Sequence, residues 1–254
     1  MARVVVFDSG LGSLSVIKEI QKLSKVEIIY FGDQENFPYG EKSKSELENI
    51  IKKSIKKMKD SFAPDLIVVG SNTPTIMLDI EDENIIGVRP PLYEAKKISK
   101  TKNIGILGTK STINSKELSR FIKNSNFNSE IKIHKINGSS LVELVESGKF
   151  LTNKSLCKKI IKGILENFIV KENIDVITLS STHLPFLKSI LEKQYPSVTF
   201  IDPANSVARK IHQKIKNKQD VHNKLKIFSS GDVKKFQKTL NKLGIKNKVN
   251  FLSI

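Results

Sequence analysis

The chain has 254 residues, of which 39% are hydrophobic and 27% charged, as in ordinary globular proteins with well-buried cores. It lacks an apolar run of roughly 18 residues and begins with a strand-like segment, so we expect neither a membrane span nor a signal peptide. The net charge of +17 comes mainly from lysines at helical spacing. Arg is sparse and no nucleic-acid motif occurs, which argues against nucleic-acid binding. The single cysteine, Cys157, cannot form an internal disulfide and fits a cytoplasmic chain.

Strand-like and helix-like segments alternate from the N-terminus onward. The first part of the chain is predicted to contain, in order, strand 3–8, helix 13–23, strand 26–33, helix 43–62, strand 64–71 and strand 85–88. The pattern then restarts with helix 91–99, strand 103–109, helix 112–122, strand 130–137, helices 140–148 and 153–169, strand 174–181, helix 185–194 and strand 197–202. The last part is predicted as helix 204–217, strand 225–230 and helix 232–244.

This alternation, with nearly continuous Val, Ile and Leu in the strands, predicts an α/β protein with parallel or mixed sheets covered on both faces. Because the pattern restarts after residue 91, we expect two α/β domains, residues 1–92 with 205–254 and residues 93–204. In open α/β sheets, ligands bind at the carboxyl ends of the strands. The polar residues that follow predicted strands are therefore the first site candidates: Asp8, Ser9, Asp33, Ser71, Asn72, Thr73, Thr109, Ser181, Thr182, His183 and Asp202.

The segment FDSGLGSLS (7–15) places Gly10 and Gly12 between a strand and a helix, as in a dinucleotide-binding turn. Ser15 stands where G-x-G-x-x-G needs its last glycine, so the motif is not met and a plain tight turn remains an alternative. A helix N-terminus here would favour an anionic ligand such as a carboxylate. No zinc or calcium spacing occurs, and the histidines are too dispersed for a metal site: His134, His183, His212 and His222.

Two further segments, VVGSNTPTI (68–76) and VITLSSTHLPFL (176–187), each end an apolar run in small hydroxyl residues. His183 follows the second strand end by two residues and could deprotonate a neighbour or simply cap the next helix. Nucleophilic Ser–His chemistry at Ser181 is conceivable. No G-x-S-x-G elbow occurs, however. The residues alone leave the chemistry of these two turns open.

Several segments resemble those of the glutamate racemase family, within the cofactor-independent aspartate/glutamate racemases. VFDSGLGSLSV resembles the family's FDSGxGGLSV, YFGDQENFPYGEKS its YxxDxxxxPYG, SNTPT its CNTAS and LSSTHLPFL its LGCTHYPLL. IGILGTKSTINS, SLVELVESG and SSGDVKKFQKTLNKLG fit further family stretches. Because these segments follow the family's order along nearly the whole chain, we interpret the chain as similar to this family in fold.

The resemblance implies two pseudo-symmetric α/β domains with the active site in the cleft between them. In the family, one cysteine from each domain flanks the α-carbon of the amino acid. One thiolate removes the α-proton and the opposite thiol returns a proton, with no cofactor. The resemblance implies that Ser71 and Ser181 stand at the two cysteine positions, with Asp8 near the first and His183 near the second. It implies that the carboxylates and the amine of the substrate are bound by Ser9, Asn72, Thr73 and Thr182. It further places Thr109 and Thr112 in another substrate-facing turn, and it implies that the cleft is lined by Pro38, Tyr39 and Gly40.

Serine at both cysteine positions is the main departure from the family. A thiol has a reference pKa of about 8.5, whereas an alcohol is closer to water at about 15.7, so serine is a far weaker acid. Asp8 and His183 could instead be the bases, with serine as a relay. Other differences near both turns suggest natural drift, although an engineered Cys-to-Ser pair is an alternative. Cys157 matches neither motif and is expected to fill a core position.

We therefore expect a cytoplasmic racemase-like enzyme that exchanges the α-proton of a small acidic amino acid. It should need neither a cofactor nor a metal, should not bind a membrane, and could form a homodimer. Two alternatives stay open. The first is a catalytically inactive amino-acid or dicarboxylate-binding protein, and the second is a different isomerase, decarboxylase or hydrolase on the same scaffold.

Overall fold

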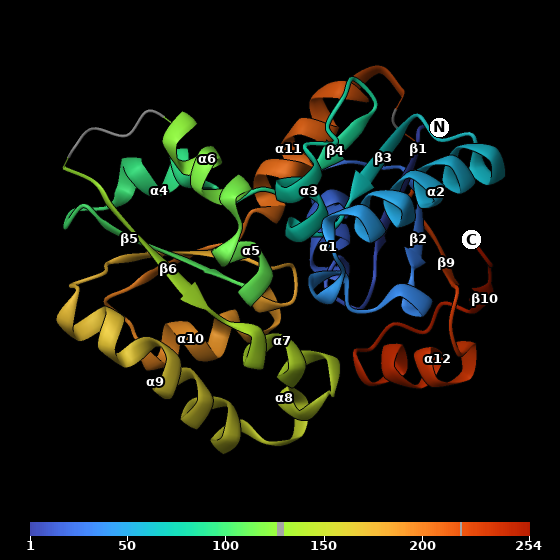
Figure 1. Cartoon of the computed structure of the whole chain (residues 1–254). Coiled ribbons are helices and arrows are strands. Elements are labelled where there is room, and N and C mark those ends of the chain that lie inside the picture. The colour runs from blue at the N-terminus through green and yellow to red at the C-terminus, as the bar shows by residue number, and fades with distance from the viewer. Residues whose placement is uncertain (126–129, 219) are drawn as a thin grey trace. The chain divides into compact units, whose positions relative to one another are not determined.

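The computed structural model of the chain describes residues 1–125, 130–218 and 220–254 (Figure 1). The described residues form two compact units, the first made of Met1–Val88 with Ala204–Ile254 and the second of Arg89–Pro203. Each unit contains one sheet of parallel strands accompanied by helices. The predicted α/β class is therefore confirmed, and the sheets are parallel rather than mixed at every strand pairing described.

The sheet of the first unit has the strand order β10-β9-β2-β1-β3-β4. Its strands are β1 (Arg3–Asp8), β2 (Glu27–Gly32), β3 (Leu66–Val69), β4 (Ile85–Gly87), β9 (Lys224–Ser229) and β10 (Val249–Phe251). The central strands β1, β2 and β3 are buried almost throughout, as expected for parallel strands covered on both faces. The C-terminal segment thus completes the sheet that the N-terminal segment begins.

The described residues of the first unit also form five α-helices and three short 3-10 helices. These are α1 (Leu14–Leu23), α2 (Lys44–Phe62), α3 (Asn72–Leu78), α11 (Ala204–Lys214), α12 (Val233–Lys242), η1 (Gln34–Asn36), η2 (Tyr39–Glu41) and η4 (Lys216–Lys218). α2 begins after Ser43 because Ser43 and Glu46 form a capping box there. Its apolar face, with Leu47, Ile51 and Met58, packs into the same core cluster as β1 and β2.

The second unit has a four-stranded sheet in the order β6-β5-β7-β8. Its strands are β5 (Asn103–Gly108), β6 (Lys132–Asn137), β7 (Val176–Ser180) and β8 (Thr199–Ile201). Its helices are α4 (Leu92–Ile98), α5 (Lys110–Asn114), α6 (Lys116–Asn124), α7 (Ser139–Glu146), α8 (Lys149–Thr152), α9 (Lys154–Lys171), η3 (Leu184–Leu187) and α10 (Lys188–Gln194). The central strands β5 and β7 are the most buried, and both end in small residues.

The structure differs from the predicted elements at a few places. A helix, α3, directly follows β3 and was not predicted; Pro74 is tolerated because it lies in the first turn. The predicted helix 112–122 is divided at Ser115, which ends α5 and caps α6 by accepting a hydrogen bond from Leu118 N–H. The short elements α8 and β10 were not predicted.

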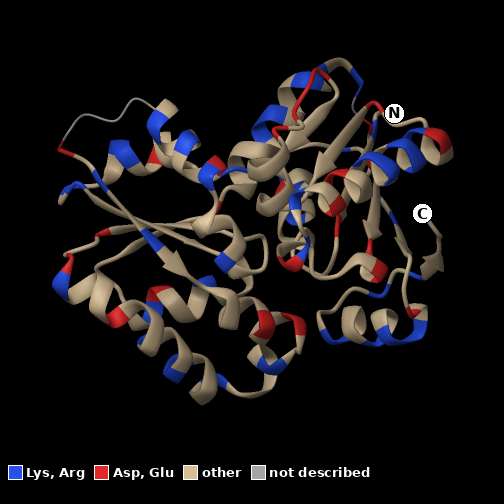
Figure 2. Cartoon of the chain, viewed as in Figure 1, with Lys and Arg blue, Asp and Glu red and all other residues tan. Residues whose placement is uncertain are grey.

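Lys and Arg positions are spread over the helices of both units, and some also lie on strands (Figure 2). Several form exposed pairs one helical turn apart, such as Lys52 with Glu48 on α2, and such pairs add little stability. Within the ranges that the structure describes, no helix is long and apolar enough to cross a membrane. The same ranges contain no group of three or more His, Cys, Asp or Glu side chains suited to a metal ion.

Candidate active site

The carboxyl ends of three neighbouring strands bring polar residues together in the first unit. Asp8 pairs with Gly32 across β1 and β2, and Phe7 pairs with Val69 across β1 and β3. The residues that follow these positions therefore share one edge of the sheet: Ser9, Asp33, Ser71, Asn72 and Thr73. All are buried except Ser71, which is half-buried. A buried polar edge of this kind is where open α/β sheets bind ligands.

Asn72, the first residue of α3, carries a side chain without partners. It is 3% exposed, and neither its amide nitrogen nor its amide oxygen bonds to any residue that the structure describes. A buried polar group left unsatisfied costs about 1–3 kcal/mol, so such groups call for an explanation. The Asn72 amide offers one donor and one acceptor function to a bound polar molecule.

Gly70 sets the backbone just before Ser71. A Cβ at Gly70 would lie 2.3 Å from the Cβ of Ser13 and 3.1 Å from the carbonyl oxygen of Phe7. The Gly70 N–H also donates to Phe7 O at 2.7 Å, which ties the end of β3 to β1. The close approach of Ser13 therefore requires glycine at position 70, and it places Ser71 directly beside the turn that leads into α1.

Asp33 fixes the loop that contains the predicted cleft residues 38–40. Its carboxylate accepts hydrogen bonds from Tyr39 Oη at 2.8 Å, Asn36 Nδ2 at 2.9 Å and Ser230 Oγ at 3.2 Å. Burial raises the pKa of Asp33, and these hydrogen bonds counter only part of the effect. Burial and the Asp33 carboxylate raise the pKa of Tyr39 well above its ordinary value, so the phenol remains a donor.

The same loop reaches the end of β1. The Tyr39 N–H lies 3.4 Å from Ser9 Oγ, and the Ser9 N–H donates to an Asp8 carboxylate oxygen at 2.7 Å. Pro38 and Gly40, on either side of Tyr39, are half-buried. The first unit thus gathers the predicted residues Asp8 and Ser9 and the loop 38–40 through direct contacts.

Hydroxyl groups gather at the corresponding edge of the second unit. Gly108 pairs with Ser180, so Thr109 and Ser181 follow the ends of neighbouring strands. Thr109 caps α5 and lies 2.9 Å from the hydroxyl of Thr112, oxygen to oxygen, and 3.2 Å from that of Ser111. Thr112 is fully buried. The two predicted threonines therefore form one hydroxyl cluster.

The turn after β7 contains a chain of three side chains. Ser181 Oγ lies 3.4 Å from His183 Nδ1, and His183 Nε2 bonds to a carboxylate oxygen of Glu146. Ser181 and His183 are 6% exposed, and the Glu146 side chain is 17% exposed. Glu146 was not among the predicted site residues, because it ends a helix 37 residues before His183. The only signal was its place in SLVELVESG, a family-like stretch of low specificity.

Comparison with known proteins identifies the family. No protein-family model matches the chain. The glutamate racemase of Sulfurihydrogenibium sp. is 33% identical over 246 residues, which cover 94% of this chain and 92% of that protein. A glutamate racemase of Actinobacillus pleuropneumoniae is 32% identical over 215 residues, covering 82% of this chain and 80% of that protein. The chain belongs to the glutamate racemase family.

Solved structures of the glutamate racemase family share the fold. A glutamate racemase isoform from Bacillus anthracis superposes with a TM-score of 0.87 at 27% identity, covering 100% of this chain and 98% of that chain. The Francisella tularensis glutamate racemase, solved in complex with D-glutamate, matches with a TM-score of 0.81 at 22% identity, covering 99% and 97%. The predicted resemblance and the predicted enzyme class, an amino-acid racemase and hence an isomerase, are confirmed.

Cys157 belongs to neither strand-end segment of this glutamate racemase family member. It is buried in α9 and its Sγ–H donates to the Asn153 carbonyl at 3.1 Å. Burial raises the pKa of the Cys157 thiol, which disfavours a reactive thiolate. The thiol therefore fills a core position, as the sequence suggested.

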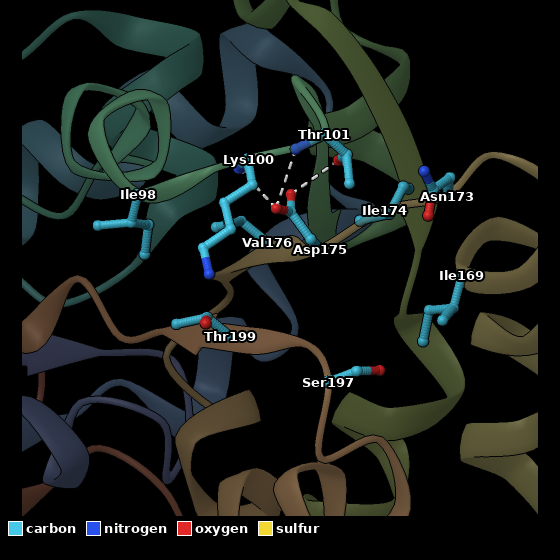
Figure 3. A pocket seen from close by; sticks show the side chains of 10 residues that line it. All are labelled: Ile98, Lys100, Thr101, Ile169, Asn173, Ile174, Asp175, Val176, Ser197 and Thr199. Carbon is cyan, nitrogen blue, oxygen red and sulfur yellow. Dashed lines mark hydrogen bonds between the residues drawn. The ribbon is translucent and has the colours of Figure 1, made fainter.

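A separate cavity of about 370 Å³ lies at the opposite edge of the second sheet, where β7 and β8 begin (Figure 3). Asp175 lies there and accepts hydrogen bonds from Ser99 Oγ at 2.7 Å and Thr101 Oγ1 at 2.9 Å, as well as from two backbone N–H groups. These bonds satisfy the carboxylate from within the protein. Asp175 therefore holds the loop before β5, and this edge lacks the unsatisfied group found at Asn72.

Proposed function

We propose that the chain interconverts the enantiomers of glutamate by cofactor-independent proton exchange at the α-carbon. In this proposal Ser71 and Ser181 occupy the positions of the two family cysteines, one supplied by each unit. The segments SNTPT and LSSTHLPFL, which follow β3 and β7, support this assignment. Family membership at 33% identity supports glutamate as the substrate.

The observation that carries the proposal is the unsatisfied amide of Asn72. An amino acid presents both a carboxylate, which accepts hydrogen bonds, and an ammonium group, which donates them. The Asn72 amide nitrogen can donate to the first and the amide oxygen can accept from the second. We propose that Ser9, Thr73 and Thr182 complete the binding of these groups, and that Thr109 and Thr112 contact the side-chain carboxylate.

Serine in place of cysteine should make the reaction slow. The reference pKa values of a thiol and of a water-like hydroxyl differ by about seven units, on the order of 10 kcal/mol in the cost of ionisation. Asp8, beside the first serine in the family pattern, and His183, beside the second, are the groups that could offset this cost. We therefore propose racemisation that is impaired relative to thiol-dependent relatives.

The rival proposal is a protein that binds an acidic amino acid without turning it over. The Asn72 amide supports it equally well, because binding alone satisfies that group. A hydrolase or decarboxylase has no comparable support among the relatives. Turnover of bound glutamate therefore decides between the two proposals.

The test is conversion of L-glutamate to D-glutamate and the reverse, measured by chiral chromatography with micromolar enzyme over hours. The purified chain should convert both enantiomers slowly, and Ser71→Ala with Ser181→Ala should abolish conversion. The double variant Ser71→Cys/Ser181→Cys should convert faster by several orders of magnitude, on the order expected from the lower thiol pKa. Glutamate binding by calorimetry without conversion in either protein would favour the binding-protein alternative.

We also propose that the protein works in the cytoplasm. A lone cysteine that is buried and free is the usual state in a reducing compartment. Fractionation of cells that express a tagged chain would test this location. Recovery with periplasmic or secreted markers would contradict it.

A further inference from the structure

The cavity where β7 and β8 begin shares no residue with the proposed glutamate site. Its volume is about 370 Å³, and the ten residues that line it all belong to the second unit (Figure 3). β7 runs from Val176, at the cavity, to Ser180, at the opposite edge of the sheet. Pockets that hold small molecules usually measure roughly 300–1,000 Å³, so this cavity has room for a small ligand.

One part of the cavity wall is aliphatic. Ile174 and Val176 are buried, and Ile169 is half-buried. Ile98, the last residue of α4, is 46% exposed although its side chain is strongly apolar. These four side chains come from α4, from α9 and from the segment that begins β7, and they line the same cavity. An alkyl group that covers them removes apolar surface from water, which favours binding.

The other part of the wall carries polar side chains that are open to a ligand. Lys100, Ser197 and Thr199 are exposed, and their side-chain polar atoms make no hydrogen bond or ion pair with a residue that the structure describes. The side chain of Lys100 extends away from Asp175 and toward Thr199 (Figure 3). An ammonium group and a hydroxyl group arranged in this way can both donate to an anion.

Asp175 restricts the charge of the ligand. Its carboxylate accepts four hydrogen bonds, from the hydroxyls of Ser99 and Thr101 and from the backbone N–H groups of Lys100 and Thr101. A carboxylate has about four lone-pair sites, so Asp175 offers no free acceptor to an ammonium group of a ligand. Its negative charge also repels a second negative charge nearby. Amino acids and phosphate dianions are therefore disfavoured, whereas a single carboxylate at the Lys100 ammonium is favoured.

We propose that this cavity binds a small aliphatic monocarboxylate. The carboxylate accepts hydrogen bonds from Lys100 Nζ and Thr199 Oγ1, and the alkyl chain packs against the four aliphatic side chains of the wall. Glutamate does not fit this site, because it carries an ammonium group and a second carboxylate where the wall is apolar. Binding here is independent of glutamate turnover, so the two proposals stand or fall separately.

The experiment titrates the purified full chain, labelled with ¹⁵N, with hexanoate and follows the backbone amides by NMR. Hexanoate should bind at one site with a Kd of ~0.1–3 mM, which is in keeping with its few non-hydrogen atoms. The amides that shift should belong to the cavity, at residues 98–101, 169–176 and 197–199. Absence of saturable shifts up to about 30 mM hexanoate, or shifts confined to other residues, would overturn the proposal.

Three related molecules test which part of hexanoate is recognised. Hexan-1-ol lacks the charge and should bind about 3–10-fold more weakly. Butanoate lacks two CH₂ groups and should bind roughly tenfold more weakly, as expected from the burial of each CH₂ group. Glutamate should not displace hexanoate. Equal binding of hexanoate and hexan-1-ol, equal binding of hexanoate and butanoate, or displacement by glutamate would overturn the proposal.

Variants test the two parts of the wall. Lys100→Gln should weaken hexanoate binding about 3–10-fold and leave hexan-1-ol binding unchanged, because only the carboxylate contacts the ammonium group. Lys102→Gln is the matched control: Lys102 is exposed in the same loop, does not line the cavity and loses the same charge. Equal weakening by both substitutions would indicate general attraction to a basic protein and would overturn the assigned site.

A substitution in the aliphatic part provides an independent check. Ile98 is nearly half exposed, so Ile98→Ser should leave the fold intact, which far-UV circular dichroism verifies. This variant should weaken hexanoate and hexan-1-ol alike, because both alkyl chains lose the same contact. Unchanged binding of both probes to Ile98→Ser would contradict the assigned position of the alkyl chain and overturn the proposal.

Discussion

Replacement of Gly70 by alanine should destabilise the first unit through one identifiable contact. The new Cβ would lie 2.3 Å from the Cβ of Ser13, a distance at which the backbone around Ser13 or Gly70 has to move. Overpacking of this kind costs about 1–3 kcal/mol, whereas exchange of glycine for alanine returns about 0.4–1 kcal/mol by restricting the unfolded chain. We therefore expect a net loss of about 1–2 kcal/mol and a lower Tm, by about 2–8 °C.

Ser13 provides the compensating change. Its hydroxyl is fully buried without a partner, and it begins α1 without a side-chain capping bond, so Ser13→Gly should be nearly neutral. The family segment FDSGxGGLSV has glycine at this position. In the double variant Ser13→Gly/Gly70→Ala the contacts with the Ser13 side chain disappear, and only the 3.1 Å approach to the Phe7 carbonyl oxygen remains. The double-mutant cycle should therefore give a coupling free energy of about 1 kcal/mol or more in favour of the pair.

The assay is urea unfolding followed by far-UV circular dichroism, with thermal unfolding alongside. Gly163→Ala is the matched control, because a Cβ at Gly163 in α9 would have no heavy atom within 4 Å. That change should stabilise by about 0.5–1 kcal/mol. The reasoning is refuted if Gly70→Ala is as stable as the parent chain, or if adding Ser13→Gly to Gly70→Ala does not recover the lost stability.

Three further predictions concern other side chains. Without ligand, Asn72→Leu should raise the free energy of unfolding by about 1 kcal/mol, measured by thermal shift. The same substitution should weaken glutamate binding at least roughly tenfold, measured by calorimetry. A less stable variant with unchanged glutamate binding would contradict this prediction. Burial alone would raise the pKa of Asp175, but hydrogen bonds from Ser99 and the following loop hold this pKa below its ordinary value. The Asp175 carboxylate therefore stabilises the fold above about pH 4, and this stabilisation is lost as pH falls through the lowered pKa. Asp175→Ala should accordingly have a lower free energy of unfolding in urea than the parent chain at neutral pH, and the difference between the two should shrink in acid. Cys157 should resist thiol reagents at neutral pH in the folded chain and react once urea unfolds it; rapid labelling of the native protein would show that the thiol is accessible.

Most of the fold followed from the sequence because its signals are local. The runs that form β1, β2 and β3 are continuous and apolar, and Ser43 with Glu46 marks the start of α2. α3 was not predicted, although its proline, Pro74, is harmless because it lies in the first turn of the helix. β10 was not predicted because it is a three-residue edge strand in a polar stretch, formed only by pairing with β9.

The candidate site was predictable where a residue follows a strand and hidden where a contact is distant in sequence. Ser71 and Ser181 follow strand ends, so topology alone selects them. Glu146 meets His183 only because α7 packs beside the turn after β7, and periodicity does not encode that contact. The roles of these side chains toward a substrate remain predictions.

The unsatisfied Asn72 amide indicates whether a site with serine at positions 71 and 181 still binds a ligand. A site that had lost its ligand would be more stable with an apolar side chain at this position, by about 1–3 kcal/mol, because nothing in the described part of the chain satisfies the amide. In the function we propose, serine at positions 71 and 181 weakens only the acid–base chemistry and leaves hydrogen bonding to an amino acid possible. Binding and turnover therefore depend on separable groups. A substitution at Asn72 should weaken binding, whereas exchange of the serines for cysteine should change rate far more than affinity.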